Sequence, residues 1–160
     1  MRLLIVAVGK LKQGPERELC AHYLARAEAA GRTLGLTPLS VIEVPESKAG
    51  TAPLRCKEEA IALLAKLPSP HRLTCLDRTG AALSSEAFAQ GLARHRDEGV
   101  RALAFLIGGA DGLGEEALAR ADQRLSLGAL TLPHGLARIV LAEQIYRAAT
   151  ILAGHPYHRA

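Results

Sequence analysis

Aromatic side chains are scarce in this chain of 160 residues, which contains no tryptophan, two phenylalanines and three tyrosines. Hydrophobic residues still make up 49% of it, enough to build a core from aliphatic side chains. Domains that read single-stranded RNA on a sheet stack the bases on several aromatic residues, so the composition argues against RRM-like and OB-like platforms. Any contact with RNA would have to depend on phosphate charge and on shape.

Cysteine is also rare, and its spacing excludes two kinds of site. Cys20, Cys56 and Cys75 are odd in number, lie far apart and form no CxxC pair. A disulfide framework and a zinc centre are therefore not indicated, and we expect no bound metal. The interpretation that remains is three buried thiols in a reducing cytosol, which predicts a cytoplasmic protein.

No apolar run approaches the ~18 residues of a membrane-spanning helix. The chain opens with the apolar run 3–8, but this run is short, and Gly9-Lys10-Leu11-Lys12 follows it in place of a small-residue cleavage site. We therefore expect a buried strand there, not a signal peptide, and no membrane partner. The formal charge of +4 and the pI near 9.2 permit an anionic partner such as RNA without requiring one.

Apolar runs and amphipathic stretches alternate along the chain. Continuous apolar runs are typical of parallel strands that are covered on both faces. The alternation predicts one three-layer α/β domain over residues 1–160, with a mainly parallel sheet. In the first two helices we expect Leu19, Leu54 and Ile61 to face the core. The expected strands are 3–8, 39–44, 72–76 and 100–107, and the expected helices are 15–30, 53–67, 84–98, 115–121 and a long one after Pro133.

Ligands of parallel α/β sheets bind beyond the carboxyl ends of the strands, which directs attention to Asp77–Gly80, Gly108–Gly114 and the chain after Leu125. Gly108-Gly109-x-x-Gly112-x-Gly114 follows a strand and precedes a helix, but its order matches neither the dinucleotide-binding nor the P-loop pattern. Glycine allows positive φ and close approach of a backbone, so both a tight structural turn and a ligand-binding loop remain open.

The segment Leu127-Gly128-Ala129-Leu130-Thr131-Leu132 offers almost no side-chain functional groups. If it binds a ligand, it does so through backbone N–H and C=O groups along an apolar slot. Such a slot would suit a flat heteroaromatic ring such as adenine. A short buried strand is the alternative.

The end of the chain is rich in polar side chains. Glu143 and Arg147 lie four residues apart on the last helix, which predicts a solvated ion pair. Two imidazoles, a phenol and a guanidinium then follow within five residues. Imidazole titrates near neutral pH and guanidinium suits phosphate, so the tail is a candidate for chemistry as well as for a frayed polar end. The side chains concerned are His155, Tyr157, His158 and Arg159.

Three segments in this order resemble the RlmH family, small SPOUT-class methyltransferases that act on ribosomal RNA. They are Leu106-Ile107-Gly108-Gly109-Ala110-Asp111-Gly112, Leu125-Ser126-Leu127-Gly128-Ala129-Leu130-Thr131-Leu132-Pro133-His134 and His155-Pro156-Tyr157-His158-Arg159. The resemblance covers the whole chain, including its length, its opening strand and its final helix. The chain departs from the family at Ala110 and Asp111, where members often have proline and glutamate, and at Gly128, where they often have another side chain.

The resemblance implies a trefoil-knotted α/β fold, in which the carboxyl-terminal segment is threaded through a loop. It also implies a homodimer in which the tail of one subunit reaches the cofactor site of the other. The implied cofactor is S-adenosylmethionine, and the implied substrate is a pseudouridine of 23S ribosomal RNA within the ribosome, methylated at N3. By position, the implied cofactor-binding residues are Leu76, Gly108, Leu127, Gly128, Ala129, Leu130, Thr131 and Leu132.

The N3 proton of a uracil-like imide must leave before or during methyl transfer, which favours a nearby base or a cation that stabilises the imidate. We therefore expect His155, His158 and Arg159 to be catalytic, and Arg138, Tyr157 and Arg159 to contact RNA. Three other functions stay open: a SPOUT methyltransferase for another RNA, a non-catalytic RNA- or ribosome-binding module, and a flavodoxin-like domain that binds an anionic small molecule. The tail weighs against the last, which has no need for it.

Overall fold

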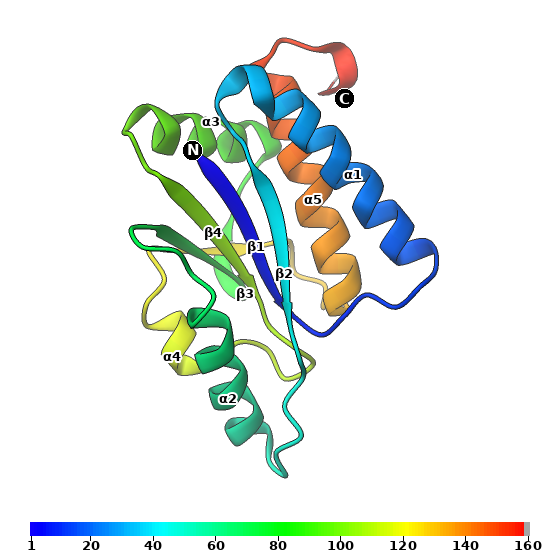
Figure 1. The fold of residues 1–160 in the computed structure, drawn as a ribbon, viewed down its shortest axis with the longest axis vertical. Coiled ribbons are helices and arrows are strands. Elements are labelled where there is room, and N and C mark those ends of the chain that lie inside the picture. The colour runs from blue at the N-terminus through cyan, green and yellow to red at the C-terminus, as the bar shows by residue number, and fades with distance from the viewer. Residues whose placement is uncertain (159–160) are drawn as a thin grey trace.

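The computed structural model describes residues 1–158, and it contains one five-stranded sheet with helices on both faces (Figure 1). The strand order is β2-β1-β4-β3-β5, and every neighbouring pair is parallel. The prediction of an α/β domain with a mainly parallel sheet is therefore confirmed. The strands are β1 (Arg2–Val8), β2 (Leu39–Val44), β3 (Arg72–Ala82), β4 (Ala102–Ile107) and β5 (Gln123–Ser126). The helices are α1 (Pro15–Gly31), α2 (Ala52–Leu64), α3 (Ser85–Asp97), α4 (Glu115–Leu118) and α5 (His134–Leu152), with short 3-10 turns at Arg32–Leu34 and Pro156–His158.

Alternate residues of β1 belong to two separate cores, which explains why the run 3–8 is apolar at every position. Leu3 and Ile5 pack in the core that includes side chains of α1, α3 and α5, whereas Leu4 and Val6 pack in the core that α2 and α4 cover. Each such fully buried aliphatic side chain contributes about 1.5–3 kcal/mol. Figure 1 shows the same division, with α2 and α4 on one side of the sheet and α1, α3 and α5 on the other.

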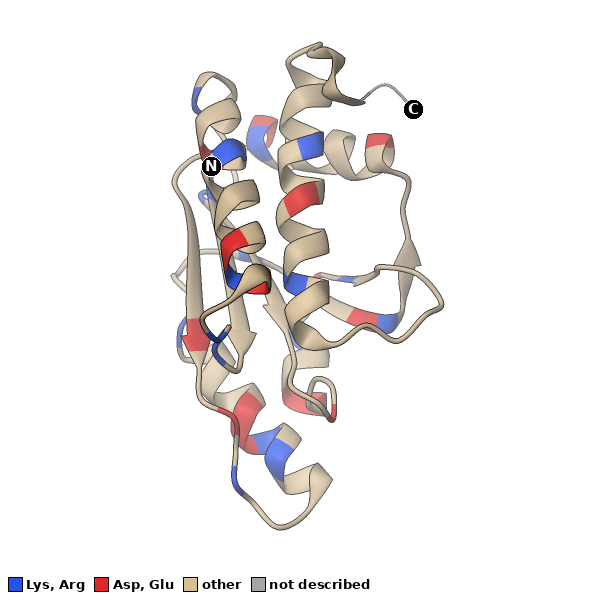
Figure 2. Ribbon diagram, turned by 90° about the vertical axis from the view of Figure 1, so that its right-hand side faces the viewer, with Lys and Arg blue, Asp and Glu red and all other residues tan. Residues whose placement is uncertain are grey.

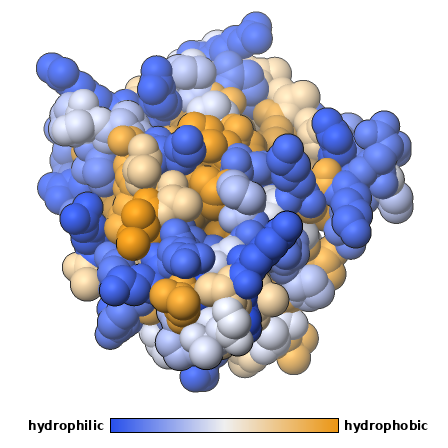
Figure 3. All heavy atoms as spheres, turned by 60° about the horizontal axis from the view of Figure 1, so that its bottom comes forward, coloured by the Kyte–Doolittle hydropathy of each residue, from blue (hydrophilic) through white to orange (hydrophobic). Residues whose placement is uncertain are grey.

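The helix faces were predicted less well than the strands. Leu19, Leu54 and Ile61 were expected in the core, but their exposed fractions are 45%, 47% and 55%. α2 packs instead through Ala60 and Leu63, on a stripe rotated away from the larger Leu54 and Ile61. Figure 3 shows apolar side chains at the surface among hydrophilic ones, on the lower face of the molecule as drawn in Figure 1.

Two further details differ from the prediction. Cys20 and Cys75 are buried as expected, but Cys56 is only half-buried, and its thiol donates to the carbonyl of Asp111 over 3.5 Å. The strand β5 was not anticipated, because its four residues are mostly polar and carry too little apolar pattern to stand out from the segment that follows.

Strand β3 is longer than the predicted strand 72–76, and its second half lies very close to the backbone of β5. Leu76 and Ala81 both lie opposite Leu125, so the residues between them form an irregularity in the register. At Gly80, an added Cβ would lie 2.6 Å from both the carbonyl carbon of Arg124 and the nitrogen of Leu125. Only glycine at position 80 leaves room for the backbones of β3 and β5 to come this close. In the sequence, the residues around Gly80 resemble a simple turn.

Gly80→Ala should therefore lower the free energy of unfolding by about 1–3 kcal/mol, the usual cost of forcing an extra methyl into a packed site. Urea denaturation followed by circular dichroism measures the difference.

Gly91→Ala is the matched control, because an added Cβ on Gly91 in α3 meets nothing within 4 Å. Alanine should raise helix stability there by up to about 1 kcal/mol. Equal unfolding midpoints for the two variants would contradict the close contact between Gly80 and the backbone of β5.

Candidate functional site

The carboxyl ends of β4, β3 and β5 lie side by side and bring together the starts of three segments that the sequence marked for ligand binding. Cys75 pairs with Leu106, and Leu76 pairs with Leu125. Gly108 directly follows the end of β4, and Leu127 directly follows the end of β5. Because parallel strands end at one edge of a sheet, residues that are far apart in sequence meet at this edge.

The loop Leu127–Leu132 presents its backbone to solvent. Leu130 is 84% exposed, and Gly128 has φ +123 with nothing within 4 Å of an added Cβ. Ser126 shapes the turn, because its hydroxyl accepts the N–H of Gly128 at 3.2 Å and donates to the Gly128 carbonyl at 3.1 Å. The alternative of a short buried strand over Leu127–Leu132 is therefore wrong, since the strand ends at Ser126.

A cavity of about 280 Å³ opens beside the first residues of this loop. Its walls are mostly apolar, with the hydroxyls of Ser85 and Ser126 and the amide of Gln144 as polar groups. This composition is typical of small-molecule sites, and it fits a ligand with a flat ring and a few polar edges. Leu76 and Gly108 do not line the cavity. The lining residues are Ala82, Leu83, Ser85, Phe88, Leu125, Ser126, Leu127, Gly128, Val140, Leu141 and Gln144.

The glycine loop Gly108–Gly114 is a tight structural turn that lies against α2. The N–H of Gly112 donates to the carbonyl of Gly109 at 3.1 Å. An added Cβ on Gly108 would lie 2.4 Å from the carbonyl oxygen of Gly112, and one on Gly114 would lie 2.5 Å from the carbonyl oxygen of Cys56. These contacts account for the glycines, and they leave a ligand role of Gly108 as a prediction.

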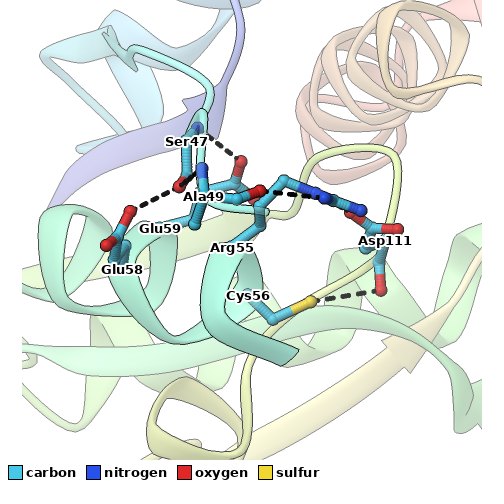
Figure 4. A network of polar contacts seen from close by, with 7 residues as sticks. All are labelled: Ser47, Ala49, Arg55, Cys56, Glu58, Glu59 and Asp111. Carbon is cyan, nitrogen blue, oxygen red and sulfur yellow. Dashed lines mark hydrogen bonds and ion pairs between the residues drawn. The ribbon is translucent and has the colours of Figure 1, made fainter. Parts of the chain in front are cut away.

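A network of polar contacts joins α2 to this loop and to the chain after β2 (Figure 4). The guanidinium of Arg55 donates to Asp111 at 2.8 Å and to the carbonyl of Ala49 at 3.0 Å. The hydrogen bond between the Arg55 and Asp111 side chains raises the pKa of Arg55 and lowers the pKa of Asp111. Asp111 was recognised in the sequence only as a departure from the family pattern, and Arg55 was assigned no role there.

A polar cavity of about 420 Å³ lies around the β1–α1 connection, which follows the carboxyl end of β1. Lys10, Lys12, Glu46 and His134 are among its lining residues. An added Cβ on Gly9 would lie 2.9 Å from Oε1 of Glu46 and 3.2 Å from Nε2 of His134, so this carboxylate and this imidazole share one small region. No spacing in the sequence predicted this group, because three separate connections contribute to it.

The tail is ordered against α5 through an aromatic and cationic cluster. The ring of Tyr157 lies 4.5 Å from that of Tyr146, with Arg147 5.2 Å from the Tyr157 ring centre. The Tyr157 hydroxyl donates to Glu143 at 3.3 Å, and Arg147 donates to the same carboxylate at 2.9 Å. Burial, followed by the hydrogen bond with Tyr23 and the negative charge of Glu143, raises the pKa of Tyr157 to about 12. The Glu143–Arg147 pair is thus part of a half-buried cluster and not the solvated pair that was predicted.

The remaining tail residues differ in what the structure describes. His155 is exposed, and its Nδ1 accepts the N–H of Tyr157 at 3.2 Å. The side chain of His158 and the whole of Arg159, both predicted to be catalytic, lie outside the described residues.

The tail and the loop Leu127–Leu132 follow and precede α5, at its opposite ends. The loop Leu127–Leu132 runs directly into its first turn, and the tail follows its last turn. At 1.5 Å per residue, the 19 residues of α5 span about 28 Å. Figure 2 shows α5 beside α1 along this length, with acidic and basic residues on both helices. Of the predicted catalytic residues, His155 therefore lies at the other end of α5 from the loop Leu127–Leu132 of the same chain.

Arg138 is buried, so its predicted contact with RNA is replaced by a structural role. Only 1% of its side chain is exposed. The guanidinium pairs with Glu43 of β2 and donates to the carbonyls of Gly9 at 2.9 Å and Val8 at 3.3 Å. Glu43 also accepts the N–H of Leu11 at 3.0 Å. One side chain of α5 thereby holds the ends of β1 and β2.

Within residues 1–158, no helix is long and apolar enough to cross a membrane, and no three His, Cys, Asp or Glu side chains are grouped to hold a metal ion.

Comparison with known proteins gives consistent matches over the whole length. The family model described as "Predicted SPOUT methyltransferase" matches residues 1–158. Proteins from Rhodopseudomonas palustris and Xanthobacter autotrophicus, each named Ribosomal RNA large subunit methyltransferase H, are 56% and 54% identical to the chain over 160 residues, with 100% of both chains covered.

Among solved structures, a probable methyltransferase from Bordetella pertussis Tohama I matches 92% of the chain with 96% of its own, at a TM-score of 0.52 and 16% identity. At this identity the match shows the fold alone.

The buried Arg138–Glu43 pair predicts a specific response to acid. Burial by itself raises the pKa of Glu43, but the hydrogen bonds from Leu11 and Arg138 and the charge of Arg138 lower it overall, below the ordinary 4.5. A lowered pKa in the folded state means that the pair stabilises above about pH 4.5, and that this stabilisation is lost as the pH falls through the lowered value. Arg138→Met should cost about 3 kcal/mol near neutral pH, because Glu43 and two carbonyls lose their donor.

Urea denaturation of wild type and Arg138→Met, compared near neutral pH and in acid below the pKa of Glu43, measures both effects. The gap between the two proteins should narrow in acid. When Arg138→Met is compared with the parent protein in a Glu43→Gln background, which keeps an acceptor without a charge, the stability gap should not narrow in acid. A gap that is independent of pH would contradict the assignment.

Proposed function

Because the chain belongs to the SPOUT methyltransferase family, we propose that it transfers the methyl group of S-adenosylmethionine to N3 of a pseudouridine in 23S ribosomal RNA. The full-length identity to proteins named as large-subunit ribosomal RNA methyltransferases supports the reaction and the RNA. The meeting of Leu76, Gly108 and Leu127 at one sheet edge supports the position of the cofactor.

When bound, S-adenosylmethionine supplies an electrophilic methyl group on its sulfonium. The loop Leu127–Leu132 would hold the adenine through backbone N–H and C=O groups beside the apolar cavity, and Leu76 of β3 and Gly108 after β4, which lie outside this cavity, would contact the rest of the cofactor. Selectivity by backbone groups explains why this loop needs no functional side chains. The protein must also align the acceptor nitrogen with the methyl group and exclude water.

The trefoil knot is part of this proposal. The close approach of β3 to β5 supports it, since an added Cβ on Gly80 would lie 2.6 Å from the backbone of Arg124 and Leu125, directly before the chain continues into the loop Leu127–Leu132. Threading of this kind would hold the cofactor loop under the β3 extension and keep it in one shape without side-chain hydrogen bonds.

A homodimer is the second part, and the position of the tail supports it. The described part of the tail begins after the last turn of α5, a helix about 28 Å long whose first turn follows the cofactor loop of the same chain. A second copy packed antiparallel along α5 would place its tail beside that loop. We assign removal of the N3 proton, or stabilisation of the resulting imidate, to His155, His158 and Arg159 of this second copy.

RNA would reach the site along the same edge. Lys10 and Lys12 beside the polar cavity supply positive charge for phosphate, in the role first expected of Arg138. Tyr157 and Arg159 remain candidates for RNA contacts. A SPOUT methyltransferase for another RNA is the alternative, and mass spectrometry of rRNA nucleosides after incubation with ribosomes and with free rRNA separates the two.

Gly128→Ala should weaken S-adenosylmethionine binding about tenfold, because the residue has φ +123 and strain of this kind costs about 1–3 kcal/mol. Isothermal titration calorimetry gives the Kd. Gly99→Ala is the matched control, since Gly99 also has positive φ (+76) and free space around it but precedes β4 at the opposite edge. Equal Kd values for the two variants would contradict a cofactor loop at Gly128.

Deletion of residues 155–160 should lower methyl transfer at least 100-fold, the low end of what acid–base groups contribute, and leave S-adenosylmethionine binding in place. Mixing the truncated protein with a full-length variant whose loop is impaired, such as Gly128→Val, should restore part of the activity. In a mixed dimer, the intact loop of the truncated subunit would face the intact tail of the Gly128→Val subunit. Full activity of the truncated protein, or no recovery on mixing, would count against a site shared between subunits.

A further inference from the structure

Helix α2 contacts the glycine loop through one continuous face. Cys56 places its carbonyl oxygen 2.5 Å from the position of a Cβ on Gly114, and Glu59 places Oε2 2.9 Å from that of a Cβ on Gly109. Both ends of the loop therefore lie flat on the helix, held by the absence of side chains. The tip of the loop has no such contact with the α2 backbone.

The tip is held by side-chain interactions of Asp111. Its carboxylate accepts from Nε of Arg55 at 2.8 Å, and its carbonyl accepts from the thiol of Cys56 at 3.5 Å. Arg55 is fixed in turn by the carbonyl of Ala49 at 3.0 Å. Figure 4 shows Arg55 between the chain after β2 and the loop, pointing at Asp111.

Asp111 is connected to the predicted cofactor contact through one neighbour. Gly112 follows it directly, and the Gly112 carbonyl oxygen lies 2.4 Å from the position of a Cβ on Gly108. Gly108 is thus stacked against Gly112, and any shift of the loop tip changes the space over Gly108. The contacts run in series from Arg55 to Asp111, Gly112 and Gly108.

The Arg55–Asp111 pair is poorly placed to serve global stability. Both side chains are 31% exposed, and exposed ion pairs contribute little to the free energy of unfolding because water and salt screen them. Its geometric effect on a loop built mainly of glycines is larger, since glycine leaves the backbone free to adopt many conformations.

We propose that Arg55 is a positioning residue for cofactor binding, which acts through Asp111 to hold the glycine loop in the shape that Gly108 needs. This rests on the proposed function, in which Gly108 contacts S-adenosylmethionine. Arg55 does not touch the reacting atoms. It also gives the aspartate at position 111 a purpose, since Arg55 needs a carboxylate there as its partner.

The test compares Arg55→Met with Arg72→Met by calorimetric titration with S-adenosylmethionine and by thermal unfolding. Arg72 is the matched control, because it forms a similar ion pair with Asp122 at 2.7 Å at the opposite edge of the sheet. We expect Arg55→Met to raise the Kd about tenfold and KM for the cofactor in parallel, with kcat and Tm little changed. Arg72→Met should leave the Kd within about twofold of wild type.

Three variants separate positioning from a general structural effect. Asp111→Asn should weaken binding as Arg55→Met does, and the double variant should be no worse than either single one. Asp111→Glu, which keeps the charge, should retain most of the affinity. A Kd unchanged in both Arg55→Met and Asp111→Asn, while Gly128→Ala binds weakly, overturns this inference alone. Absence of binding by the wild-type protein overturns the proposed function itself.

Discussion

The buried guanidinium of Arg138 is the interaction on which the arrangement of this edge depends. It joins α5 to the carboxylate of Glu43 and to the last carbonyls of β1, three parts of the chain that are far apart in sequence. A cation in this position is tolerated because its two terminal nitrogens meet a carboxylate and two carbonyls, while its buried Nε has no hydrogen-bond partner within residues 1–158. It anchors the first turns of α5, and the loop Leu127–Leu132 is therefore held at its far end as well as at β5.

Around this anchor, the candidate cofactor site is made almost entirely of backbone. The glycine loop and the β3–β5 contact at Gly80 depend on missing side chains, which let backbones approach within distances that a Cβ would forbid, whereas Gly128 in the loop after β5 is set apart by its positive φ. Such a site has few groups of its own that could hold it in shape. The side chains that do so come from outside the loops: Ser126 for the turn at Gly128, and Arg55 for the tip at Asp111.

Helix α5 separates two kinds of chemistry. One end carries the apolar, backbone-lined loop that suits a heteroaromatic cofactor, and the other carries the cluster of Tyr146, Tyr157, Glu143 and Arg147 with His155 beside it. Methyl transfer to a weakly acidic nitrogen needs both a bound donor and a way to stabilise the anion. The proposed antiparallel pair of chains would satisfy this requirement twice, since each α5 would bring one tail to one loop.

The sequence by itself determined four of the five strands and the segments worth inspecting. The all-apolar run 3–8, the glycines after Ile107 and the side-chain-poor segment Leu127–Leu132 each follow from local chemistry, so they could be read without knowing any contact. The family was visible for the same reason, because its motifs are short and contiguous.

Only the tertiary structure decided the roles of single side chains. Arg138 looked like a surface cation and is buried, Leu54 and Ile61 looked like core residues and are exposed, and Arg55 had no recognisable role until it was seen beside Asp111. The reason is physical: a local pattern records which side chains are apolar or charged. The partner that a charge meets, and the stripe of a helix that is covered, depend on elements dozens of residues away that approach only when the parallel sheet has formed.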